Sequence, residues 1–158
     1  MFQASLEYMT AKAWIQMAKE SNRQALKLLA SLFGKQSLPY TLLESAQSVM
    51  KPVSEHTLHV TTTLIYEMQS LSALLNSTKP WDPKYKEVAQ HLTSAMACLL
   101  SAAEFPNKEN QEAARELFKE EEIQPETAEK ALVLADKVLT KIAADLPQIK
   151  MPPPLTIP

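Results

Sequence analysis

A chain of 158 residues is the size of one ordinary domain, and a hydrophobic share of 46 % supplies enough apolar material for one core. The formal net charge of −2 gives no general attraction to nucleic acid or to acidic membranes. A single cysteine excludes an intramolecular disulfide, and a single glycine argues against the phosphate-binding loops and tight hairpins that depend on glycine.

The first predicted helix runs from about Phe2 to Phe33, because its apolar residues recur at the three- and four-residue spacing of an amphipathic helix. Asn22 and Arg23 interrupt the apolar stripe, so a bend at that point is an open alternative. Gly34 follows directly and is well placed to end the helix.

The second predicted helix runs from about Thr41 to Ser77, and its apolar residues keep one helical phase on both sides of Pro52. Continuous phase favours one long helix kinked at the proline. Two separate helices are the alternative, although Lys51 would be a poor N-cap. Residues 57–66 are rich in β-formers and could form a strand, but no other segment offers a partner, so we predict a helix there too.

The remaining predicted helices are identified by capping residues and prolines at the positions where they begin. Asp82 followed by Pro83 is a favourable N-cap and first position for a third helix, which stops before Pro106. Asn107 can cap a short fourth helix, and Pro125 begins a fifth.

The predicted fold is therefore all-α: a bundle of about five helices with a long N-terminal antiparallel helix pair. Residues 1–147 form a single helical-bundle domain. Residues 148–158 are rich in proline and form an extended tail, which could pack on its own bundle or on a neighbouring subunit.

Candidate metal or acid–base residues occur on two predicted helices. His56 and His59 lie three residues apart on one, and His91 and Cys98 lie seven apart on the other, so a site built from both is conceivable. The His-Glu-x-x-His and paired Glu-x-x-His patterns are absent from the sequence. We therefore expect no catalytic residue, metal site or cofactor, and we interpret Cys98 as a buried, inert thiol.

The strongest signal is the charge distribution. Within Thr41–Thr78 only Glu44, Lys51, Glu55 and Glu67 are charged, whereas an ordinary exposed helix carries more charge. Depletion of charge with retention of Met, Tyr and Leu is typical of an interface. Three interpretations stay open: a central helix buried in its own bundle, a subunit interface, and a face adsorbed to a lipid or polymer surface.

These patterns predict a non-enzymatic protein–protein interaction module, a scaffold or adaptor that self-associates as a homodimer. Polar side chains without charge are cheaper to desolvate than charged ones, which selects as interface candidates Thr61, Thr62, Tyr66, Gln69 and Ser70. The first alternative is an amphipathic helical coat protein of a lipid or polymer granule, similar to phasins by composition only. The second is a cryptic enzyme or metal-binding bundle.

The expected location is the cytoplasm. The sequence contains no apolar stretch long enough for a transmembrane helix, and its first residues lack the basic region and apolar run of a signal peptide. The expected partner is another protein, with no nucleic acid and no membrane span.

Overall fold

The computed structural model describes residues 10–51, 55–78, 81–103, 108–120 and 123–146. Of these residues 87 % are helical and none is in a strand, which confirms the predicted all-α class. In chain order the elements are α2 (Ala11–Phe33), α3 (Leu38–Val49), α4 (Thr57–Ser77), the 3-10 turn η1 (Pro83–Tyr85), α5 (Lys86–Ala102), α6 (Lys108–Lys119) and α7 (Pro125–Asp145).

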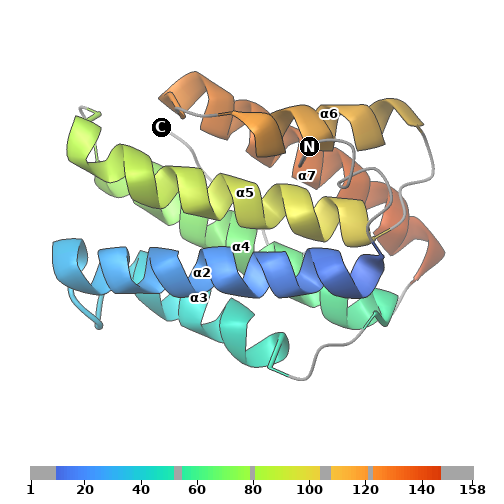
Figure 1. The fold of residues 1–158 in the computed structure, drawn as a ribbon, viewed down its shortest axis with the longest axis horizontal. Coiled ribbons are helices and arrows are strands. Elements are labelled where there is room, and N and C mark those ends of the chain that lie inside the picture. The colour runs from blue at the N-terminus through green and yellow to red at the C-terminus, as the bar shows by residue number, and fades with distance from the viewer. Residues whose placement is uncertain (1–9, 52–54, 79–80, 104–107, 121–122, 147–158) are drawn as a thin grey trace.

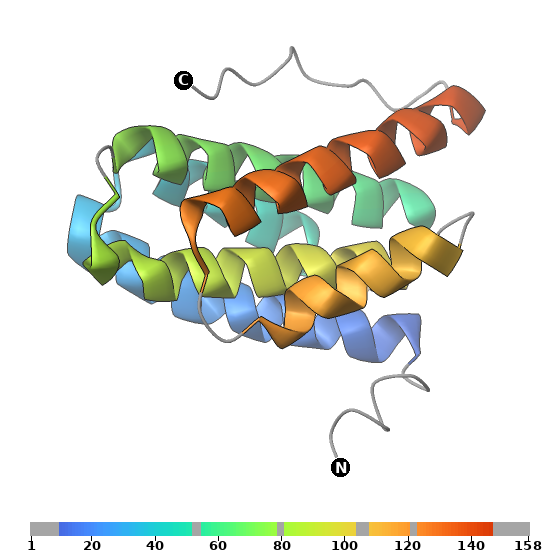
Figure 2. The same ribbon diagram turned by 90° about the horizontal axis from the view of Figure 1, so that it is seen from above.

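The helices form three layers of two, as Figure 1 shows: α2 with α3, α5 with α4, and α6 with α7. Each helix packs on its partner and on the next layer, so that α2 lies on α5, α3 on α4, α6 on α5 and α7 on α4. Successive helices run in opposite directions (Figure 2), as short connections between helices require.

The middle layer, α4 and α5, has helices packed on both of its sides, and most of the buried side chains lie there. This position accounts for much of the missing charge in α4, because a charge on a covered face would be buried. Among the described residues, the largest fully buried side chains are Ile15, Leu29, Leu43, Leu64, Leu71, Leu74, Leu92, Met96, Leu99, Leu100, Ile123 and Leu139.

The prediction of one long kinked helix was wrong. The chain leaves helix α3 after Val49 and enters helix α4 at Thr57, and the two pack side by side as a hairpin. The N-cap of α4 is His56, whose Nδ1 accepts a hydrogen bond from the Leu58 backbone N–H at 3.2 Å. The apolar phase matches across Pro52 because both helices turn one stripe toward the same core, so continuous phase did not require a continuous helix.

The ambiguous segment 57–66 is helical, as predicted. Its threonine hydroxyls donate to backbone carbonyls four residues earlier, at 2.6 Å from Thr61 and 2.8 Å from Thr62 and Thr63. These bonds give the hydroxyls local partners, which lets a threonine-rich segment fit into a packed helix.

Helix α2 is continuous through Asn22 and Arg23. Its first turn is capped by Thr10, whose Oγ1 accepts from the Ala13 N–H at 3.1 Å, and its earlier predicted start lies outside the described residues. Gly34 ends the helix as predicted: its φ is 89°, and its N–H donates to the Ala30 carbonyl at 3.1 Å.

Asp82 and Pro83 open the third predicted helix through the short turn η1, in which the Asp82 carboxylate accepts from the Lys84 N–H at 3.0 Å. The predicted fifth helix begins at Pro125, as α7 does. The predicted cap Asn107, and the predicted tail of residues 148–158, lie outside the described residues.

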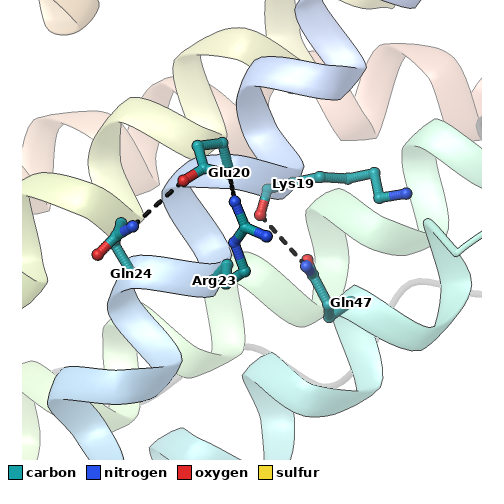
Figure 3. Close-up of polar contacts among 5 residues, drawn as sticks. All are labelled: Lys19, Glu20, Arg23, Gln24 and Gln47. Carbon is teal, nitrogen blue, oxygen red and sulfur yellow. Dashed lines mark hydrogen bonds and ion pairs between the residues drawn. The ribbon is translucent and has the colours of Figure 1, made fainter.

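The α2–α3 layer also carries a partly exposed polar network, shown in Figure 3. The Gln47 side chain on α3 donates to the Lys19 carbonyl on α2 at 3.2 Å. On α2 itself, Glu20 accepts hydrogen bonds from Arg23 and from Gln24. The Gln24 bond, followed by the charge of Arg23, lowers the pKa of the Glu20 carboxyl. The network thus joins the two helices of this layer at their surface.

Candidate functional site

The feature with the most unusual chemistry is a buried polar contact at the centre of the bundle. Helices α2, α3, α4 and α5 form a closed ring of neighbours in which α2 and α4 occupy diagonal corners. Asn22 projects from α2 and Glu67 from α4, both side chains are fully buried, and the amide acts on the carboxyl across the ring. The two groups come from helices that do not pack directly against one another.

Burial dominates the electrostatics of this contact. It raises the pKa of Glu67 from 4.5 to about 8, and the Asn22 amide nearby only partly opposes the rise. Burial, and after it the Glu67 charge, also raises the pKa of the Cys98 thiol on α5. Cys98 is buried, as the sequence predicted, and its thiol stays protonated at neutral pH.

The pair can hold and release a proton. A protonated carboxyl has one O–H donor and one carbonyl acceptor, and an amide likewise offers both, so neutral Glu67 and Asn22 are complementary. Ionised Glu67 could only accept. Within the described residues no hydrogen bond of ordinary geometry reaches the polar side-chain atoms of either residue, so the contact is costly for a core.

Sequence reasoning missed this pair, although both residues carried a signal. Glu67 is the one Asp, Glu, Lys or Arg of α4, and it falls on the core-facing side together with Leu64 and Leu71. Asn22 occupies a core position of the apolar stripe of α2, where it was noticed only as an interruption. No pattern in the sequence indicates that the two residues approach each other, because α2 and α4 do not pack directly on one another.

The predicted interface residues of α4 divide into two groups. Thr61 and Ser70 are buried within the bundle, and the Ser70 hydroxyl donates to the Pro39 carbonyl on α3 at 2.7 Å. These two are covered by the chain's own helices and cannot meet a partner. Thr62, Tyr66 and Gln69 remain partly exposed, so the interface stays a prediction for these three.

The histidines and Cys98 lie in separate surroundings. The His56 and His59 rings, both exposed, are 6.0 Å apart between centroids at the start of α4. His91 is partly exposed, with Nε2 4.0 Å from the Glu87 Oε1 on the same helix, whereas Cys98 is fully buried. Among the described residues, no three His, Cys, Asp or Glu side chains gather as metal ligands.

Comparison with protein-family models, with curated proteins and with solved structures finds no match for the chain. None of the helices in the described ranges combines the length and apolar character needed to cross a membrane.

Proposed function

We propose that the chain is a non-enzymatic helical interaction module that self-associates as a homodimer through the outward strip of α4. The strip consists of partly exposed residues at helical spacing, none of them charged: Leu58, Thr62, Ile65, Tyr66 and Gln69. This uncharged strip on an open face is the observation that supports the proposal.

Burial within the bundle accounts for the missing charges on the inner sides of α4 but not on the outward strip. Thr61, Thr63 and Ser70 are covered, so charge is excluded there by the chain's own packing. The residues of the outward strip are partly exposed, so burial within the bundle excludes charge less strictly there. A partly exposed surface without charge suits a partner, and Tyr66 is the type of residue that anchors interfaces.

A second copy of the chain is the proposed partner because a two-fold axis presents the same strip from both sides. Neither copy then places a charge in the contact. Desolvating threonine, tyrosine and glutamine side chains costs much less than desolvating charges.

Arginine at Thr62 and at Gln69 tests the proposal. Each change should weaken association by about 1–3 kcal/mol, because it buries a charge without a partner near the axis. Sedimentation equilibrium of the native chain and of the double variant measures the effect. Arginine at the exposed Gln16 of α2 is the control and should leave association unchanged. A native chain that remains monomeric at high micromolar concentration refutes the homodimer.

The same uncharged strip would suit a lipid or polymer surface. The alternative function is therefore a granule coat protein, which is similar to phasins by composition only. Flotation of the purified chain with vesicles or granules separates the two functions, since a dimerising scaffold stays in the soluble fraction. Metal analysis of the purified chain tests the cryptic metalloprotein: one bound zinc or iron per chain would favour it.

A further inference from the structure

We propose that the homodimer forms by exchange of the proline-rich tail: residues 148–158 of each copy bind across the outward strip of α4 on the other copy. This inference rests on the proposed function and deepens it, because it names the segment that the partner copy contributes to the contact.

The outward strip is too small to hold two copies together by itself. A standard protein–protein interface uses about 20–30 residues on each side, whereas the strip has five residues and each of them is only partly exposed. Within the described stretch from Val60 to Leu75 no residue of α4 is exposed, and α3 and α7 both pack on this helix. Further contact area has to come from another segment of the partner, and an extended segment is narrow enough to lie along such a strip.

The chain enters the tail at the end of the bundle where the strip begins. Helices α4 and α7 are in contact, and Figures 1 and 2 both show the end of α7 at the same end of the bundle as the start of α4. From Leu58 to Gln69 the strip extends about 17 Å along the helix axis. Residues 148–158 in an extended conformation would reach about 34 Å. The tail is therefore long enough to cross from its own bundle to the strip of a partner that faces it.

The composition of the tail matches an uncharged surface. Its one charged residue is Lys150, near its start, and four of its residues are prolines, which have no N–H group to desolvate. Proline-rich segments in an extended conformation bind surfaces that carry aromatic side chains, and the strip contains Tyr66. The apolar side chains that the tail can place on the strip are Ile149, Met151, Leu155 and Ile157.

Exchange allows the tail and the dimer to use the same strip. A tail bound to its own strip would cover the surface through which the two copies associate. In a two-fold arrangement each tail instead fills the strip of the other copy, so the same contact is made twice. Each contact holds the second tail close to its strip and so strengthens the other contact.

Leu155→Asp in the full chain tests the exchange. Sedimentation equilibrium should show dimerisation about tenfold or more weaker than in the native chain, because a charge is placed against an uncharged strip. Gln148→Asp adds the same charge at a polar position of the tail and is the matched control, which should dimerise as the native chain does.

The other results of this measurement separate the tail from the dimer. If Leu155→Asp dimerises as tightly as the native chain, the exchange is overturned and the homodimer stands. Tighter dimerisation would mean that the tail covers its own strip, which also overturns the exchange. A native chain that stays monomeric at high micromolar concentration removes the proposed function, and the exchange with it.

Mixing two variants distinguishes exchange from any other effect of the tail. Thr62→Arg changes the strip and leaves the tail intact, whereas Leu155→Asp changes the tail and leaves the strip intact. Each variant alone loses both tail contacts of its dimer, but the mixed dimer keeps one. Sedimentation with a fluorescent label on one variant should show the mixed pair associating about tenfold more tightly than either variant with itself. No gain on mixing overturns the proposal.

A synthetic peptide of residues 148–158 makes the test independent of how the variants fold. An excess of this peptide should compete with the tails and convert native dimers to monomers, whereas the same peptide carrying Leu155→Asp should not. Native dimers that persist in the presence of excess native-sequence peptide would contradict tail exchange.

Discussion

Replacing Glu67 by glutamine should remove most of the pH dependence of stability between about pH 5 and pH 8. Glu67 is fully buried, and burial raises its pKa from 4.5 to about 8 in the folded chain. Below pH 4.5 the carboxyl is protonated in both the folded and the unfolded state, and the native chain has its full stability. As the pH rises, the unfolded state releases the proton while the folded state still holds it, so stability falls until the pH passes the folded pKa.

The size of the loss follows from the difference between the two pKa values. At 1.36 kcal/mol per pKa unit, the free energy of unfolding should decrease by roughly 4–5 kcal/mol between the acidic and the alkaline limits. Typical domains have only about 5–15 kcal/mol in total. Ionisation of this one buried carboxyl would thus remove a large part of the free energy of unfolding above pH 8.

Urea unfolding followed by circular dichroism at pH 5.5, 7 and 8.5 measures this loss. Glu67→Gln lacks the titrating carboxyl, so its free energy of unfolding should be nearly the same at all three pH values. The exposed Glu44→Gln serves as the control and should follow the native chain. Parallel pH dependence in the native chain and in Glu67→Gln would show that the carboxyl ionises as freely in the folded state as in the unfolded one, which refutes the reasoning.

Two further substitutions test the packing. Gly34→Ala meets no atom within 4 Å but must adopt a φ of 89°, so thermal unfolding should show a loss of about 1–3 kcal/mol from backbone strain alone. Leu99→Ala empties part of the middle layer at a fully buried position and should cost about 2–5 kcal/mol in chemical denaturation. A result near zero for either would show that the local structure relaxes around the change.

The helices were predictable because each depends on local signals. Apolar residues at helical spacing marked the inner sides of α2, α5 and α7, and the starts at Asp82 and Pro125 were visible as capping residues. The division between α3 and α4 was missed because the spacing of apolar residues shows which face of a helix is apolar. It does not show whether one helix continues or a second one begins. The capping role of His56 was not anticipated either, since histidine is not among the favoured N-cap residues.

The buried contact could not be placed from sequence because it depends on which helices become neighbours. Glu67 and Asn22 are far apart in the chain and lie on helices that do not pack directly on one another. The charge depletion in the α4 region is visible in the sequence, but its meaning depends on the layer order: Thr61 and Ser70 are buried in the bundle, whereas Thr62 and Gln69 are partly exposed.

Charge depletion in α4 has two proposed origins, burial within the bundle and contact with a partner. Substitutions at two adjacent positions can separate them. Thr62 is partly exposed on the outward strip, and Thr63 is fully buried, yet both hydroxyls bond to the backbone four residues earlier at 2.8 Å. Arginine at Thr63 must be driven into the core, so it should cost on the order of 3–5 kcal/mol and lower the melting temperature by about 10 °C or more.

Arginine at Thr62 keeps its charge in water when the chain is a monomer and should change the unfolding free energy of dilute protein by less than about 0.5 kcal/mol. Its effect should appear only in association at high concentration. Differential scanning calorimetry at low concentration, paired with sedimentation equilibrium, separates the two quantities. Equal destabilisation by both substitutions in dilute protein would mean that the outward strip is covered within the chain itself, and the case for a dimer through α4 would be lost.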